Sequence, residues 1–208
     1  MDSEYCSMGR WISVIVADKL KMKLYEGKDL AVLAEEDWLT EEYLQNFDEQ
    51  IADMSTKEVL EKTDILKVHQ ALSKAILKAV ELGPCIIHER AASTILNERD
   101  DCLKVLLYNT SMEHRIPRAI ADKTYDLENK THDELVAFIN REDHKRKVYR
   151  DALTKEAWGD KESYDICLDS DILSREKCAE ILIEAMQDVS LNLDECKQII
   201  KNSFDWSR

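Results

Sequence analysis

Two pairs of basic side chains, each pair one helical turn apart, are the first candidates for chemistry in this sequence. Arg141 and Lys145 form one pair and Arg146 and Arg150 the other, with Asp143 among them. Residues at this spacing share a face of a helix. Positive charge gathered in one place favours a bound anion, so we expect residues 139–157 to contribute to an anion site.

Three further arginines follow apolar stretches that have the composition of buried strands. Arg90 comes just after the run 85–88, and Arg115 and Arg118 lie one turn apart in a helical segment after the run 103–108. The planar guanidinium group of arginine can hold two phosphate oxygens at once. Arginine pairs are also common on solvent-exposed helices, so the spacing alone leaves both interpretations open.

The stretch CSMGR, residues 6–10, immediately precedes an amphipathic segment over residues 10–21. The backbone N–H groups at the start of a helix form a natural site for phosphate. Ser7, Gly9 and Arg10 are candidates for such a site. An ordinary helix start with a Ser or Gly cap explains the same residues, and the stretch by itself does not decide between the two.

Short apolar runs separated by helical segments predict an α/β fold with a parallel sheet flanked by helices. The runs are residues 22–25, 85–88, 103–108 and 164–168. Ligands of open α/β sheets bind at the carboxyl ends of the strands, which is where Arg90 should lie. His88 ends one run and has no metal-binding partner at a suitable spacing, so we expect a hydrogen-bonded histidine there.

The segment 143–165 resembles the closing part of the cytidylate kinase-like family of P-loop nucleoside monophosphate kinases, in which a D-x-x-R helix precedes a W-x-x-x-x-x-Y-D strand. The matching residues are Asp143, Arg146, Trp158, Tyr164 and Asp165. The resemblance extends over residues 85–96 and 103–120, and more weakly over 6–12. It implies a single domain over residues 1–208, with a helical arm over about 38–82 and a helical lid over about 131–160.

The same resemblance implies phosphoryl transfer from the cofactor ATP, with Mg²⁺, to a nucleoside monophosphate or another small molecule. It assigns no protein residue to the metal. The expected catalytic residues are Arg10, Arg146 and Arg150; those that bind ATP are Ser7, Gly9, Arg10, Arg115 and Arg118; those that bind the acceptor are Arg90, Asp143 and Arg146. We also expect the arginines at 90, 115, 118, 146 and 150 to line one cleft.

Several positions depart from the family's pattern. Cys6 and Met8 stand where the family's G-S-G-G-R loop has glycines, and each adds a Cβ that disfavours a positive φ. Trp11 lies where a Mg²⁺-binding hydroxyl is usual, and no GK[ST] sequence is present. These departures favour an alternative, a catalytically inactive pseudokinase that binds a nucleotide, another anion or a protein. A purely structural helical protein is the third hypothesis.

The family also has an apolar strand in the middle of the sheet, just before its loop, whereas this sequence begins MDSEY. Asp2 and Glu4 would lose their hydration in a strand buried on both faces. We therefore expect the first five residues not to fill the central position. Either a preceding segment, or a segment from elsewhere in this chain or in a partner chain, should occupy it.

The composition limits the partners of the protein. A formal net charge of −14 argues against nucleic acid, since binding to its backbone needs a basic face. No apolar run reaches the roughly twenty residues of a membrane helix. The six cysteines form no C-x-x-C pair and fit reduced thiols in a cytoplasmic protein. The expected partner is a nucleotide or another phosphate-bearing small molecule, and association into a homo-oligomer stays open.

Overall fold

The computed structural model describes residues 1–88, 91–154 and 156–187. Within these residues, five short strands all pair in parallel: β1 (Asp2–Ser3), β2 (Lys23–Tyr25), β3 (Cys85–Ile87), β4 (Val105–Tyr108) and β5 (Ile166–Asp169). β2 pairs with β3, and β4 pairs with both β1 and β5. The predicted α/β fold with a parallel sheet is confirmed, and each of the four apolar runs contains or overlaps a strand.

The first residues of the chain form the central strand, contrary to our expectation. β1 pairs with β4, and the amino group of Met1 donates a hydrogen bond of 2.7 Å to the carbonyl oxygen of Ile87 in β3. The strands pair as two sheets, β2-β3 and β1-β4-β5; the hydrogen bond of Met1 places β1 beside β3, so the strands lie in the order β2, β3, β1, β4, β5. The expectation that another segment would fill the central position is wrong.

One carboxylate oxygen of Asp2, Oδ2, has polar partners in this buried strand, whereas Oδ1 has no hydrogen-bond partner among the described residues. The residue is 4% exposed, and its carboxylate accepts hydrogen bonds from Arg150 at 2.7 Å, Tyr164 at 2.9 Å and Ser93 at 3.1 Å. A buried charge is acceptable when it is paired and hydrogen-bonded. The buried start of the chain thus has its counter-charge inside the protein.

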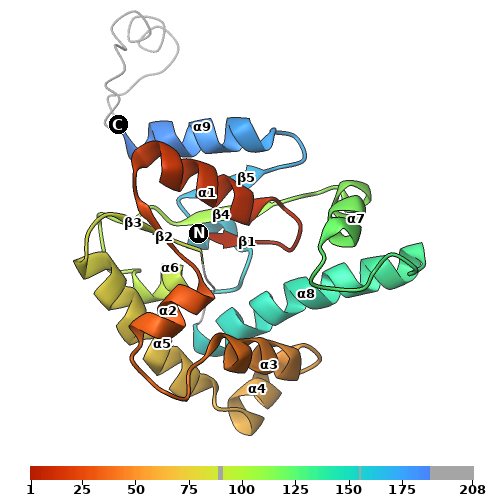
Figure 1. Cartoon of the computed structure of the whole chain (residues 1–208), viewed down its shortest axis with the longest axis horizontal. Helices are drawn as coiled ribbons and strands as arrows, with labels where there is room; N and C mark the ends of the chain where they lie inside the picture. Colours follow the sequence, from red (N-terminus) through yellow and green to blue (C-terminus); the bar gives the residue numbers. More distant parts are fainter. Residues whose placement is uncertain (89–90, 155, 188–208) are drawn as a thin grey trace, which may run out of the picture.

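Helices cover both faces of the sheet (Figure 1). α1 (Gly9–Leu20) and α9 (Arg175–Met186) pack together on one face, where Ile12, Val16 and Leu182 are fully buried. On the other face, α5 (Ile65–Glu81), α6 (Ala92–Ile95) and the end of α8 (His132–Leu153) share a second apolar core. A parallel sheet needs this cover on both sides.

The expected arm region contains α3 (Glu41–Ile51), α4 (Thr56–Lys62) and α5. Ahead of it, α2 (Gly27–Leu33) starts at a capping box of Glu26 and Asp29 and ends before Glu35, whose backbone is left-handed (φ 56°). α8 starts at another capping box, formed by Thr131 and Glu134, and lies in the expected lid region. α3 and α4 both contact α8, so the regions expected to form the arm and the lid pack against each other.

α7 (Met112–Ala121) begins after Ser111, whose side chain accepts a hydrogen bond from the backbone N–H of His114. A short 3₁₀ turn, η1 (Lys161–Ser163), leads toward β5. A further helix that the sequence pattern indicates over residues 193–200, and the tail from Ser203, lie outside the described residues. None of the helices in the described part of the chain is long and apolar enough to cross a membrane.

Candidate functional site

The loop of residues 4–8 joins β1 to α1. Its backbone is left-handed at Cys6 (φ 62°) and at Met8 (φ 67°), a conformation that is unfavourable for a residue with a Cβ. Ser7 is fully buried; its N–H donates to the carbonyl oxygen of Glu4 at 3.2 Å, and its Oγ lies 2.9 Å from that oxygen and 3.0 Å from the carbonyl oxygen of Leu107. Ser7 therefore supports the loop from within and does not present its hydroxyl to a ligand.

α1 starts at Gly9, directly after this loop, and its N-cap residue Met8 makes no side-chain capping bond. The N–H groups of a first helical turn attract anions, because the helix dipole is positive at this end. A Cβ added to Gly9 would lie 2.3 Å from the Cβ of Ser3, far closer than two carbon atoms pack. Glycine here lets the start of α1 lie directly against β1.

His88 follows β3 beside the same loop. Its Nε2 lies 3.0 Å from the Oγ of Ser3, so the predicted hydrogen-bonded histidine is confirmed. Burial, reinforced by the positive charges of the Met1 amino group, Arg146 and Arg10, lowers the pKa of His88 to about 3. The imidazole is therefore neutral at pH 7 and adds no positive charge beside the loop.

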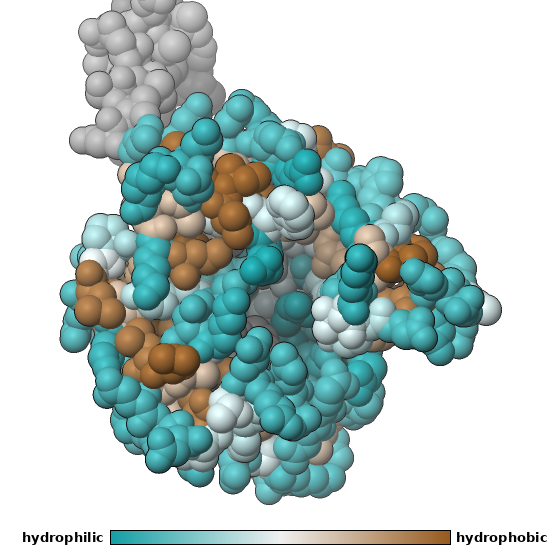
Figure 2. Space-filling model, viewed as in Figure 1, coloured by the Kyte–Doolittle hydropathy of each residue, from teal (hydrophilic) through white to brown (hydrophobic). Residues whose placement is uncertain are grey.

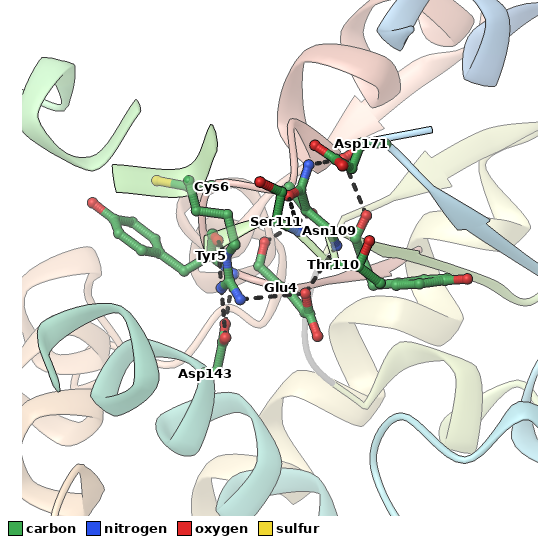
Figure 3. Close-up of polar contacts among 12 residues, drawn as sticks. Glu4, Tyr5, Cys6, Asn109, Thr110, Ser111, Asp143 and Asp171 are labelled. Carbon is green, nitrogen blue, oxygen red and sulfur yellow. Dashed lines mark hydrogen bonds and ion pairs between the residues drawn. The ribbon is translucent and has the colours of Figure 1, made fainter. Parts of the chain in front are cut away.

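Arg115 and Asp143 hold the peptide groups of Tyr5. The N–H of Tyr5 donates to Oδ1 of Asp143 at 2.7 Å, and Nε and Nη2 of Arg115 donate to the carbonyl oxygen of Tyr5 at 2.9 and 2.6 Å. Arg115 and Asp143 also pair with each other. Figure 3 shows Asp143 reaching from α8 toward Tyr5. Both side chains thus use most of their hydrogen-bonding groups inside the protein.

Two more arginines lie beside the loop. Arg118 on α7 is partly buried and donates to the carbonyl oxygen of Cys6 at 2.9 Å. Arg146 on α8 stands over the ring of Tyr5, with its Cζ 5.7 Å from the ring centroid. Burial raises the pKa of the Cys6 thiol to about 11, so the thiol stays neutral. Three arginines, Arg115, Arg118 and Arg146, and three carboxylates, Glu4, Asp122 and Asp143, thus lie in or beside the loop.

Arg150 does not belong to this group. It is completely buried, pairs with Asp2 and Glu156, and places its Cζ 4.9 Å from the ring centroid of Tyr164. The expectation that Arg115 and Arg150 line an open cleft is wrong, because both are buried against carboxylates. Arg90 lies outside the described residues.

Polar side chains that sequence analysis did not single out lie on another side of the loop, where β4 and β5 end. Glu4 accepts a hydrogen bond of 2.9 Å from the N–H of Asn109, whose side-chain amide donates to Ser170 at 3.2 Å. Thr110 donates to Asp169 at 2.7 Å (Figure 3). Burial raises the pKa of Glu4 above its ordinary value. Asn109 and Thr110 follow the apolar run 103–108, and Asp169 and Ser170 follow the run 164–168; this place at the strand ends was the signal that would have found these four.

A pocket of about 290 Å³ opens between the start of α1 and the arm. At its edge, Nε and Nη2 of Arg10 donate to the two carboxylate oxygens of Glu26 at 2.5 and 3.0 Å. Figure 2 shows this face of the molecule hollowed near its centre, between α1 and α2 on one side and α7 and α8 on the other. The pocket itself is lined by residues at the starts of α1 and α2 and from α3: Arg10, Glu26, Gly27, Lys28, Glu41, Leu44, Gln45 and Asp48.

The residues around the loop do not fit a Mg²⁺ ion held by the protein itself. Among the described residues, no three His, Cys, Asp or Glu side chains gather as a metal site would require. The hydroxyl of Ser13 is used inside α1, since it donates to the carbonyl oxygen of Gly9. Trp11, at the position where a Mg²⁺-binding hydroxyl is usual, is 59% exposed on α1 and has no oxygen in its side chain. A Mg²⁺ ion would have to enter with the phosphates of a nucleotide.

A parallel sheet with this strand order, a helix that starts directly after the central strand, and arginines around that start define a nucleotide kinase-like α/β protein. The model of the cytidylate kinase-like family matches residues 1–172. The chain therefore belongs to the cytidylate kinase-like family, as the resemblance over its middle and end indicated.

Among solved structures, the chain is similar in fold to an uncharacterized protein from Eubacterium ventriosum, with a TM-score of 0.66 and 18% sequence identity. The similarity covers 90% of this chain and 96% of that one. At this identity it shows the fold alone. No curated protein matches the chain.

Proposed function

We propose that this chain binds the phosphates of a nucleoside triphosphate, ATP first among them, at the start of α1, and transfers a phosphoryl group to a small acceptor such as a nucleoside monophosphate. The observation that carries the proposal is the shape of loop 4–8, which is left-handed at Cys6 and Met8 and leads directly into a helix. Successive N–H groups in such a turn form an anion-binding concavity.

Cations near the loop support phosphate binding. Arg146 lies beside it, and Arg10 projects from the first turn of α1. The ion pair of Arg10 with Glu26 is largely exposed on the arginine side, so exchanging Glu26 for a phosphate costs little. Phosphoryl transfer depends mainly on positioning and on charge stabilisation. Arg90 remains the proposed contact to the acceptor phosphate.

A second candidate, a member of the family that binds a nucleotide without transferring phosphate, is favoured by a different observation. Three residues expected at the site, Arg115, Asp143 and Arg150, form ion pairs inside the protein. Fewer cations are then left to stabilise the charge that develops during transfer. Such a protein would serve as a nucleotide or anion sensor, or as an interaction module.

Titration calorimetry with ATP, with and without Mg²⁺, tests binding, and ADP release with a panel of nucleoside monophosphates tests transfer. Arg146→Met should weaken ATP binding by about tenfold, the value of one hydrogen bond to a charged group. Lys147→Met, on the exposed side of α8 beside Asp151, should leave it unchanged. Binding without ADP release supports the second candidate, and absence of ATP binding would contradict phosphoryl transfer from ATP.

We further propose that residues 1–208 act as one domain in the cytoplasm, with an arm over about 38–82 and a lid over about 131–160. Reduced thiols are the normal state of cysteine in that compartment. The net charge of −14 is unfavourable for nucleic acid and leaves a small phosphate-bearing ligand as the proposed partner.

A further inference from the structure

Loop 4–8 is strained at two places. Cys6 and Met8 both carry a Cβ, and both are left-handed. Each such residue lowers the population of this loop shape by on the order of tenfold relative to a relaxed backbone. The loop keeps its shape only if contacts from the rest of the protein outweigh that loss.

Three side chains from α7 and α8 supply such contacts, and they bind the peptide groups just before and between the strained positions. Asp143 accepts from the N–H of Tyr5, Arg115 donates twice to the carbonyl oxygen of Tyr5, and Arg118 donates to that of Cys6. The side chains of Arg115 and Asp143 are only 6% and 16% exposed, and their ion pair fixes each against the other.

The side chain of Tyr5 ties the same loop to the same two helices. Its hydroxyl donates to Asp122, just after α7, at 2.9 Å. Its ring meets Tyr125 and Phe138 edge-on, at centroid distances of 6.3 and 5.8 Å. A displacement of α7 or α8 would therefore also displace loop 4–8.

We propose that Arg115, Arg118 and Asp143 are positioning residues, a clamp that keeps loop 4–8 in its phosphate-binding shape before a nucleotide arrives. The inference rests on the proposed function of the loop. In this role the three side chains act on the ligand through the loop and do not contact it. Glycine at positions 6 and 8 would adopt the left-handed backbone without strain. With Cys6 and Met8 there, the contacts of the clamp offset that strain.

Hydrogen exchange of the ligand-free chain tests the clamp without any ligand. In Arg118→Met and in Asp143→Ala, the amides of Tyr5 and Ser7, which donate to Asp143 and to Glu4 in the native chain, should exchange at least about tenfold faster than in the native chain. In Lys147→Met, a control on the exposed side of α8, the same loop amides should exchange at the native rate. Arg118 is only partly buried, so its variant should fold normally. Native exchange rates in Arg118→Met would overturn the clamp.

Sodium tripolyphosphate then tests whether the clamp acts through the loop. The double variant Cys6→Gly/Met8→Gly removes both Cβ atoms, so the left-handed shape depends less on the clamp. Arg118→Met should weaken tripolyphosphate binding by about tenfold in the native background, and by less than about threefold in the double-glycine background. An equal loss in both backgrounds would mean that Arg118 contacts the anion, against the clamp.

The two experiments separate two kinds of failure. If tripolyphosphate does not bind the native chain, the proposed function of the loop is wrong, and the exchange rates of Tyr5 and Ser7 still decide whether the clamp exists. If the anion binds and the exchange rates stay native in the variants, the clamp is wrong and the proposed function stands.

Discussion

Gly9 is the residue at which one added carbon atom would push α1 away from β1. Gly9→Ala should lower the free energy of unfolding by about 1–3 kcal/mol, because overpacking forces the backbone to move. The new Cβ would lie 2.3 Å from the Cβ and 2.5 Å from the Oγ of Ser3. Urea unfolding at pH 7 measures the loss.

A second substitution shows whether that contact is the cause. Ser3→Gly removes both crowded atoms, so Ser3→Gly/Gly9→Ala should be more stable than the sum of the two single losses predicts. Strictly additive losses would show that Gly9 matters for another reason.

His88 should make the stability of the protein depend on pH. Its pKa is about 3 in the folded protein, against an ordinary value of 6.5, so between these values the unfolded chain binds more protons. The free energy of unfolding should therefore fall as the pH drops below 6.5, by up to about 1.4 kcal/mol per pH unit from this residue. His88→Gln should remove that part of the slope in urea unfolding at pH 7, 6 and 5.

His132 is the matched control for this prediction. It is exposed, and its hydrogen bond with Glu113 raises its pKa, so its contribution is present at low pH and is lost as the pH rises through the folded pKa. His132→Gln should leave the acid-side slope of the native protein in place. Equal slopes for the native chain and His88→Gln would show that His88 is protonated in the folded state.

The sequence predicted where cations gather but not what they bind. Arg115, Arg118 and Arg146 lie around one loop, whereas the sequence pattern predicted arginines that line a cleft. A charge pattern cannot separate an external phosphate from the protein's own oxygen atoms, since both attract a guanidinium group. Arg115 finds its acceptors 28 and 110 positions away, in Asp143 and Tyr5, and no local pattern contains that information.

Ion pairs of two kinds tie the element α8 to the arm. Lys145 is buried, with its Nζ 2.5 Å from Glu142 and 2.6 Å from Glu49. Arg141 pairs with Glu49 and Asp53 nearer the surface. Breaking a buried pair leaves an uncompensated charge in the interior, whereas an exposed pair exchanges its partner for water.

Lys145→Met should therefore lower the free energy of unfolding by about 3–5 kcal/mol, because Glu142 would stay buried without its cation. Arg141 lies one turn away on the same helix and also pairs with Glu49. Arg141→Met should lower the free energy of unfolding by about 1 kcal/mol or less. Urea unfolding of the two variants gives the comparison. Two equally small losses would mean that Glu142 is neutralised in another way.

Elements with local signals were predictable, and β1 was not. β4 and β5 are short apolar runs, and Ser111 marks the start of α7. β1 contains Asp2, which by itself argues against a buried strand. Its burial depends on partners 91 to 162 positions further along the chain, so only the folded structure shows why it is allowed.

For the whole molecule, the Asp2–Arg150 ion pair joins the central strand to the last turn of α8. Arg150→Met should lower the free energy of unfolding by about 3–5 kcal/mol, because Asp2 would keep a buried charge without its partner. The double variant Asp2→Leu/Arg150→Met should lose less unfolding free energy than Arg150→Met alone, since neither buried charge remains. A catalytic Arg150 would behave in the opposite way, with native stability in urea unfolding and lost ADP release.

The central position of β1 also sets an order of events while the chain is being made on the ribosome. Residues 2 and 3 leave well before Tyr164, which binds Asp2 and follows 162 positions later. At the usual elongation rate of about 5–20 residues per second, the nascent strand waits roughly 10–30 s for its last partner. During that time the carboxylate of Asp2 stays hydrated. The same charge that is costly to bury in the folded protein therefore makes the unpaired strand segment hydrophilic and less prone to aggregate.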